Sequence, residues 1–278
     1  MIYFTKTARG YSHINENAVC QDFSSSYYDD NRIIITACDG HGGSIYIRSD
    51  RGSRFACDAI LNVLKRIAPN SLSNITKDTF IDKIKLQILC EWNELVEKDL
   101  SKFPFTNIEL SVLRDEQILN LKNNPEVAYG TTLNACMVMD KFYVFVKLGD
   151  GGVFYIKDNK ATCVFDDIDE NVANITHSIC QERAYAYMHV AVMPKKDIEG
   201  ALICTDGLLT PYQSYVNFQE SFVKPVVKKF QKGDKSKEIK QFIAKVASKI
   251  GSGDDVSLGM MLCEPKPIKK KKNNKNKK

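Results

Sequence analysis

The stretch Ile33-Ile-Ile-Thr-Ala-Cys38-Asp39-Gly40-His41-Gly42-Gly43 decides how the rest of the chain is interpreted. Its first six residues are apolar or β-branched, which predicts a buried strand that ends at Asp39. The residues that follow present a carboxylate, an imidazole and three glycines at the strand end. Because glycine has no side chain, a metal ion or a phosphate can approach this backbone closely. The stretch therefore indicates a metal- or phosphate-binding site at the end of a strand.

Three other expected strands carry aspartates at their ends. Asp150-Gly151-Gly152 and Asp206-Gly207 each follow an apolar run, and Asp254-Asp255 precede the apolar run that begins at Val256. A single Asp-Gly pair is more typical of a hairpin turn than of a functional site. Its recurrence at strand ends favours a shared site. Clustered carboxylates without accompanying cysteine or histidine ligands suit hard cations such as Mg²⁺ or Mn²⁺ rather than zinc or copper.

The apolar periodicity along the chain predicts groups of strands that alternate with groups of helices. We expect strands at residues 22–28, 32–38, 131–139, 142–148, 152–156, 161–165, 188–193, 201–204 and 256–263. We expect helices at residues 53–67, 79–100, 109–121, 216–230 and 237–250. This order favours an α+β fold with an antiparallel sheet core over a parallel, doubly wound one.

The composition excludes several classes of protein. The chain has 278 residues, of which 44% are apolar and 26% charged, as in an ordinary globular protein. No apolar run is long enough to span a bilayer, and the first residues lack the features of a secretory signal, so we expect a cytoplasmic protein. Nine cysteines without a C-x-x-C pair indicate reduced thiols rather than disulfides or a zinc site.

The C-terminal residues differ in composition from the rest. Residues 266–278 hold eight of the 39 lysines and arginines and no acid, so the remainder has 31 basic against 34 acidic residues. We expect residues 265–278 to form a disordered lysine-rich tail. Two interpretations stay open: a solubilising terminus, or a weak electrostatic contact with nucleic acid or an anionic membrane.

Six motifs in register resemble those of the protein phosphatase 2C family, the metal-dependent serine/threonine phosphatases. They are Cys20-Gln21-Asp22, Asp39-Gly-His-Gly-Gly43, Gly130-Thr-Thr132, Gly149-Asp150-Gly151, Thr205-Asp206-Gly207 and Gly253-Asp254-Asp255-Val-Ser257. The C-Q-D form of the first motif is similar to that of bacterial members. The resemblance implies a four-layer αββα fold, an antiparallel β-sandwich flanked by helices on both faces. It also implies that residues 1–264 form one catalytic domain, which we expect to be a monomer.

The resemblance also implies the ligands of two Mg²⁺ or Mn²⁺ ions. Asp39 matches the carboxylate that bridges both ions, and Gly40 matches a backbone carbonyl ligand. Asp206 and Asp254 match the acids that complete the first metal site. Asp22 matches the acid that reaches the ions largely through water. Asp150 matches the acid that, with Asp206, binds a third and weaker ion in several members.

The implied reaction is hydrolysis of phosphoserine and phosphothreonine in proteins by direct attack of a metal-bridging hydroxide. Two divalent ions lower the pKa of a shared water and hold the attacking and leaving oxygens in line. His41 is the candidate general acid for the leaving alkoxide; the alternative is that it only hydrogen-bonds a metal-bound carboxylate. A second hypothesis for the whole chain is a catalytically silent regulatory or adaptor protein with the same fold. Such a protein would ordinarily have lost metal-site aspartates, which this sequence keeps.

One position departs from the pattern of the family. Most relatives have an arginine that grips the phosphate five residues before Asp22, and here that residue is Asn17. We expect another cation to bind phosphate, with His13 as the first candidate and Arg48 as the second. The alternatives are that His13 only positions Asp22 and that Arg48 makes ordinary structural contacts.

Overall fold

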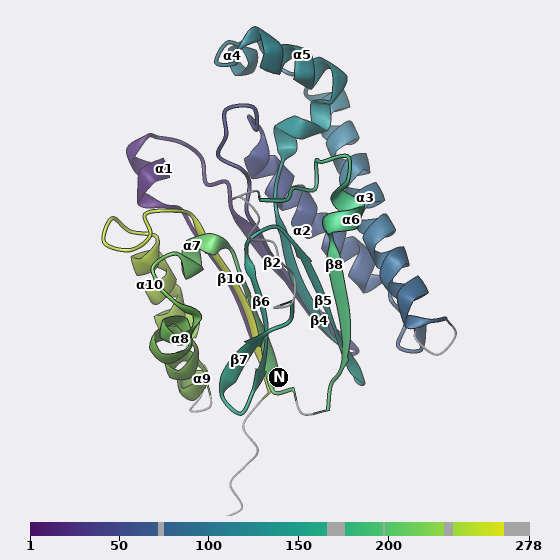
Figure 1. The fold of residues 1–278 in the computed structure, drawn as a ribbon, viewed down its shortest axis with the longest axis vertical. Helices are drawn as coiled ribbons and strands as arrows, with labels where there is room; N and C mark the ends of the chain where they lie inside the picture. The colour runs from purple at the N-terminus through teal and green to yellow at the C-terminus, as the bar shows by residue number, and fades with distance from the viewer. Residues whose placement is uncertain (72–74, 166–175, 197, 231–235, 264–278) are drawn as a thin grey trace, which may run out of the picture.

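Two five-stranded antiparallel sheets form the centre of the molecule (Figure 1). The structure is a computed structural model, and it describes residues 1–278 except 72–74, 166–175, 197, 231–235 and 264–278. In order, the first sheet contains β1 (Ile2–Ala8), β10 (Val256–Leu262), β9 (Gly200–Cys204), β6 (Gly152–Lys157) and β7 (Lys160–Cys163). The second contains β2 (Phe23–Asp29), β3 (Arg32–Cys38), β4 (Leu133–Val138), β5 (Phe142–Leu148) and β8 (His189–Pro194).

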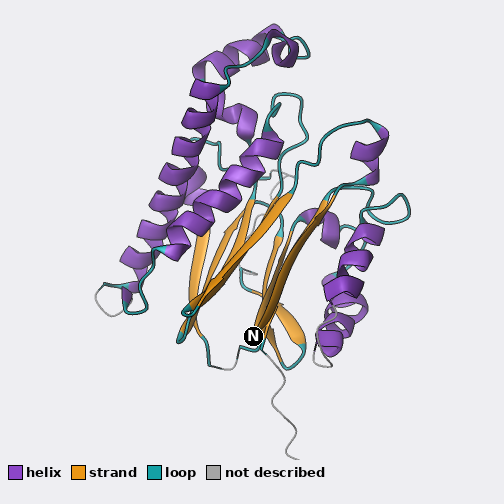
Figure 2. Cartoon of the chain, turned by 180° about the vertical axis from the view of Figure 1, so that it is seen from behind, coloured by secondary structure: helices purple, strands orange, loops and turns teal. Residues whose placement is uncertain are grey.

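Helices cover the outer face of each sheet, which makes four layers (Figure 2). The second sheet packs against α2 (Ser49–Lys65) and α3 (Lys77–Lys102). The first sheet packs against α8 (Tyr215–Phe218), the π-helical turn η3 (Gln219–Val223), α9 (Lys224–Phe230) and α10 (Ser236–Val246). The expected α+β fold with a four-layer αββα arrangement is confirmed.

The alternation of side chains along the strands creates a separate apolar core in each space between layers. In β3, Ile34 points toward α2 and α3, whereas Ile35 points toward the other sheet. Both side chains are fully buried. Strands whose two faces are both buried read as continuous apolar runs, and this explains the sequence of residues 33–38.

Shorter helices lie at the end of the sandwich where β3 and β9 terminate (Figure 1). They are α1 (Tyr11–Asn15), α4 (Asn107–Leu110), α5 (Asp115–Asn123), the 3₁₀ helix η2 (Pro125–Tyr129), α6 (Ala184–Tyr187) and α7 (Asp206–Leu209). The loops at this end carry the aspartates identified in the sequence. In the part of the chain that the structure describes, no helix is long and apolar enough to cross a membrane.

Two expected helices differ from the structure, and several short helices and one strand were not expected. The expected helix at 109–121 is two short helices, because Thr106 forms a capping box with Glu109 and a second helix starts after Arg114. The expected helix at 216–230 contains a π-helical turn just before Pro225, which has no N–H to donate to a preceding carbonyl. The strand β1 was not assigned from the sequence. The tail at 265–278 lies outside the described residues.

Candidate active site

Five of the predicted acidic and glycine ligands line one cavity at this end of the sandwich. The cavity has a volume of about 230 Å³. It is lined by His13, Gln21, Asp39, Gly40, His41, Gly42, Thr132, Asp150, Thr176, Asp206, Asp254 and Asp255. Asp22 is buried behind this lining, and its negative charge acts on Asp39. No lysine or arginine is among the described residues that line the cavity.

The backbone of Asp39 is fixed by the start of the neighbouring strand. Asp39 N donates to Thr132 Oγ1 at 3.1 Å, and Thr132 N donates back to Asp39 O at 2.8 Å. Thr131 Oγ1 also donates to Asp39 O, at 2.7 Å. These bonds give the Gly-Thr-Thr motif a physical role: it holds the end of β3 so that the Asp39 carboxylate faces the cavity.

Gly40 lies where a side chain would not fit. A Cβ atom at this position would be 2.5 Å from Ser49 O and 2.7 Å from Gln21 O. Gly40 N donates to Gln21 O at 3.2 Å, which ties the motif that contains Asp39 to the loop that contains Asp22. The glycine is therefore required by close backbone packing beside the cavity.

Asp22 and Asp206 are connected through a threonine that the sequence analysis did not single out. Thr205 Oγ1 donates to Asp22 Oδ2 at 2.8 Å and accepts from Ser257 N at 2.9 Å. Thr205 precedes Asp206, which is the first residue of α7. One hydroxyl thus sets the positions of two candidate ligands, and its place in the Thr-Asp-Gly motif was the signal available in the sequence.

The remaining candidate ligands come from two other loops. Asp150 lies between β5 and β6, after Gly149 with a φ of +95°, and Asp150 Oδ2 accepts from Thr176 Oγ1 at 2.6 Å. Asp254 lies just before β10 and lines the same cavity. The carboxylates therefore come from strand ends in both sheets.

Burial and mutual repulsion raise the pKa values of the carboxyl groups of Asp22, Asp39 and Asp206. Burial raises the pKa of Asp39 well above its usual range, and the negative charges of Asp22 and Asp206 raise it further. Burial is also the largest cause of the raised pKa of Asp22 and of Asp206. Because Asp39 and Asp206 lie in the same buried site, sharing one proton is favoured over ionising both carboxyl groups.

The donor set fits hard divalent cations. Asp206 Oδ1 is buried and has no hydrogen-bond partner, and a buried oxygen of this kind is costly unless something binds it. A cation would replace the shared proton and offset the repulsion among the acids. Within the described residues, no three acidic, histidine or cysteine side chains are already arranged as a ready-made ligand group. The fit therefore rests on donor chemistry and charge.

His41 is held beside the carboxylates by backbone and ring contacts. His41 N donates to Gly130 O at 3.1 Å, and its ring centroid lies 4.9 Å from that of Tyr46. Burial lowers the pKa of His41, and the negative charge of Asp150 partly opposes this effect. The imidazole is thus positioned at the cavity, with its neutral form favoured.

His13 lines the cavity and contacts an acid other than Asp22. His13 Nδ1 lies 2.9 Å from Asp255 Oδ2, an ion-pair distance without the alignment of a hydrogen bond. Asp255 also accepts from Gly10 N and Gln21 N, both at 2.6 Å. Asp255 therefore fastens the segment that leads to Asp22, a role that the sequence analysis missed.

The comparisons with known proteins agree with this geometry. The family model for protein phosphatase 2C matches residues 9–244. The chain belongs to this family. Members are phosphoprotein phosphatases, so the expected class of hydrolase is confirmed. No protein in the search of curated sequences matched the chain.

Several solved structures share the fold. A bacterial serine phosphatase has 16% sequence identity and a TM-score of 0.61, with 96% of this chain and 100% of that chain covered. The catalytic domain of the serine/threonine phosphatase PstP in complex with two manganese ions has 15% identity and a TM-score of 0.58, covering 93% and 96%. The serine/threonine phosphatase Stp1 from Staphylococcus aureus has 16% identity and a TM-score of 0.56, covering 94% of each chain.

Arg48 does not lie at the cavity of this phosphatase. Its guanidinium is buried and bonds to Glu109 Oε1 at 2.6 Å, to Tyr129 Oη at 2.7 Å and to the carbonyl of Phe103 at 2.7 Å. Its remaining terminal nitrogen donates to Pro104 O and to Glu109 Oε2. The structure thus supports the alternative that Arg48 makes structural contacts, and we do not retain it as a phosphate ligand.

Proposed function

We propose that the chain is a metal-dependent protein serine/threonine phosphatase that hydrolyses phosphoserine and phosphothreonine directly, without a phospho-enzyme. One observation carries the proposal: Asp22, Asp39, Asp150, Asp206 and Asp254 lie together at one end of the sandwich. The pKa values of the three most buried, Asp22, Asp39 and Asp206, are raised. Such a group of carboxylates is stable in its charged form only with cations.

Asp39, Asp206, Asp254 and the carbonyl of Gly40 would hold two Mg²⁺ or Mn²⁺ ions, and Asp150 would contribute to a third. The two manganese ions in the PstP structure support this hypothesis. When bound, two such ions activate a bridging water and stabilise the charge that develops on the phosphate. Asp22, held by Thr205, would accept hydrogen bonds from metal-bound water rather than bind an ion directly.

Two histidines that line the cavity would act on the phosphate itself. His41 would donate a proton to the leaving alkoxide, since it lies on the loop that follows Asp39 and faces the same cavity. His13 stays the candidate cation for a phosphate oxygen, because it lines the same cavity from α1. We keep the predictions of a cytoplasmic location and of the bacterial C-Q-D branch on the sequence argument alone, and we infer a role in signalling from the proposed activity on phosphoproteins.

The alternative of a catalytically silent adaptor predicts the same fold without turnover. Hydrolysis of a phosphothreonine peptide, measured with Mn²⁺, Mg²⁺ or a chelator present, distinguishes the phosphatase from the adaptor. We expect hydrolysis with either metal and none with the chelator. Asp39→Asn should reduce turnover by more than about 100-fold, the loss that even an outer partner of a metal ligand can cause.

The matched control is Asp30→Asn, which removes the same charge from the exposed turn between β2 and β3, at the opposite end of β3. Its activity should equal that of the wild type. Wild-type turnover by Asp39→Asn with an unchanged circular dichroism spectrum would remove Asp39 from this role. Absence of metal-dependent turnover in the wild type would favour the adaptor.

A further inference from the structure

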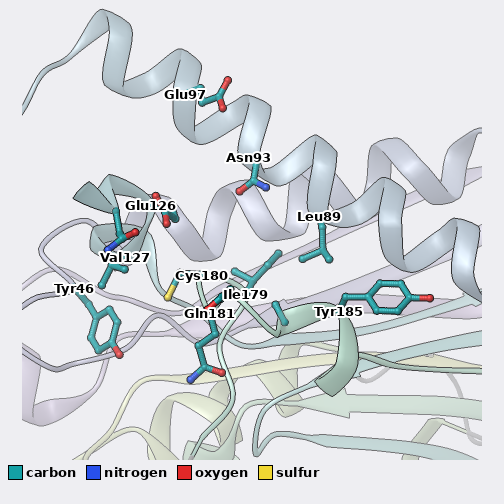
Figure 3. A pocket seen from close by; sticks show the side chains of 13 residues that line it. Tyr46, Leu89, Asn93, Glu97, Glu126, Val127, Ile179, Cys180, Gln181 and Tyr185 are labelled. Carbon is teal, nitrogen blue, oxygen red and sulfur yellow. The ribbon is translucent and has the colours of Figure 1, made fainter. Parts of the chain in front are cut away.

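A second cavity, larger than the carboxylate cavity, lies beside it. It has a volume of about 710 Å³, and it lies between α3, η2 and the segment at 179–185 (Figure 3). It is lined by Tyr46, Leu89, Asn93, Glu97, Asn124, Glu126, Val127, Ile179, Cys180, Gln181, Glu182, Ala184 and Tyr185. A volume of this size accommodates a long side chain of the substrate together with part of the peptide that carries it.

Two parts of the chain connect this second cavity to the candidate active site. The ring of Tyr46 lines the second cavity and lies 4.9 Å, between ring centroids, from His41, which lines the first. Thr176 lines the first cavity and Ile179 the second. Three residues of extended chain span at most about 10 Å, so the two cavities are neighbours.

The charge of the second cavity is negative. Glu97, Glu126 and Glu182 line it, and no lysine or arginine is among its described lining residues. None of the three glutamates forms an ion pair with another described residue. Burial raises the pKa of the Cys180 thiol, which lines the same cavity, and the negative charge of Glu126 adds to this effect. At the rim, Lys85 Nζ lies 5.1 Å from the ring centroid of Tyr185.

We propose that this glutamate-lined cavity binds a lysine or arginine of the substrate that lies close in sequence to the phosphorylated residue. The inference rests on the proposed function, and it assigns the substrate class as basic phosphopeptides. Carboxylates attract the cation, and the ring of Tyr46, which lines the cavity, offers a surface on which a cationic side chain can stack. Because an extended peptide advances about 3.3 Å per residue, the basic residue should lie about two to four positions from the phosphorylated one.

The test compares two phosphothreonine peptides that differ only at one position. One carries lysine three residues from the phosphothreonine, and the other carries glutamine there; the pair is made once on the N-terminal side and once on the C-terminal side. The wild type should hydrolyse one lysine peptide with a kcat/KM about three- to tenfold higher than its glutamine partner, the size expected of one or two partly exposed ion pairs. The preference should shrink in 0.5 M salt.

The variant Glu97→Gln/Glu126→Gln should lose this preference. The control variant Asp30→Asn/Glu199→Gln removes the same charge at the opposite end of the sandwich, from exposed positions outside the cavity, and should keep it. A wild-type ratio near one for both peptide pairs, or an equal preference in the two double variants, would overturn the proposal.

Hydrolysis of p-nitrophenyl phosphate reports on the metal centre separately, because this substrate has no peptide. If the metal-dependent turnover of p-nitrophenyl phosphate is absent, the proposed function fails, and the cavity is then tested by the binding of fluorescently labelled peptides. Tighter binding of the lysine peptide to the wild type than to Glu97→Gln/Glu126→Gln supports the cavity. Equal affinities for the lysine and glutamine peptides overturn it.

Discussion

The replacement of the usual phosphate-binding arginine by Asn17 has a backbone explanation. Asn17 has a φ of +55°, in the left-handed region that asparagine adopts more readily than arginine does. It follows α1, and Ala18 N donates to His13 O at 2.8 Å to close the helix end. The tight turn at Asn17 keeps His13 beside Asp255 and the carboxylate cavity. The turn at the end of α1 thus accounts both for an asparagine at position 17 and for the position of His13.

Replacement of His41 distinguishes its two possible roles. His41→Ala should slow hydrolysis of a phosphoserine peptide by about 100-fold or more, the size of general acid catalysis, and should affect p-nitrophenyl phosphate far less because nitrophenolate leaves without a proton. Burial lowers the pKa of His41 below its usual 6.5, so the acid form grows as the pH falls. The ratio of wild-type to variant rates on phosphoserine should therefore rise toward low pH. Equal losses on both substrates would assign His41 to positioning a carboxylate.

At the scale of elements, Arg48 and Glu109 join the start of α2 to α4. The bond from Arg48 lowers the pKa of Glu109 to about 2. A carboxyl group with a depressed pKa stabilises the fold above its unfolded value near 4.3, and this stabilisation is lost as the pH falls toward 2. Glu109→Gln should lower the free energy of unfolding by about 1–2 kcal/mol at pH 7, less than a fully buried pair would lose.

The reduced loss follows from the exposure of Glu109, whose side chain is 26% accessible. The measurement is urea denaturation at pH 7 and at about pH 2.5, where the difference between the wild type and the variant should be much smaller. Glu116→Gln is the control, because its pair with Arg114 is exposed on both sides and should change stability by less than about 0.5 kcal/mol. A difference at Glu109 that persists at low pH would show that packing, not charge, is lost.

The elements that could be predicted from the sequence are those whose residues are buried along their whole length and therefore form a continuous apolar run. The strand β5 was predicted with its observed bounds at 142–148, because every residue between its turns is buried or nearly so. The strand β1 was not predicted, because only Phe4 among its seven residues is buried and the others form no apolar run. The break between α4 and α5 depends on capping bonds and on the Arg48–Glu109 pair, which join distant residues and leave no local periodicity.

The same contrast holds in the candidate site. The positions of Asp39, Asp150, Asp206 and Asp254 at strand ends were enough to predict that they meet. The anchoring by Asp255 and the hydroxyl of Thr205 depends on pairing between β1, β10 and the loop before β2, which a linear pattern does not specify. The burial of Arg48 was missed for the same reason.

At the scale of the whole molecule, the function is concentrated at one end of the sandwich. The strands β3, β5 and β9 run toward this end, and β2, β6 and β10 begin there. Their middles are fixed by three apolar cores, so the loops at their ends can carry charged groups that repel one another. The cores thus supply the stability that offsets the repulsion among the carboxylates.

The lysine-rich residues 265–278 follow β10 in the sequence. β10 runs from Val256, next to Asp255, to Leu262, so the chain leaves the sandwich at the end opposite to the carboxylate cavity.

Removal of residues 265–278 should therefore leave the metal-dependent kcat/KM for p-nitrophenyl phosphate unchanged. It should also abolish any binding to anionic vesicles or DNA that weakens with salt, since the remaining residues have a small acidic excess. The measurement compares the two chains in both assays at about 0.05 and 0.5 M salt. A large fall in activity on the small substrate would show that the tail belongs to the catalytic unit, and absence of salt-dependent binding by the full chain would favour a solubilising terminus.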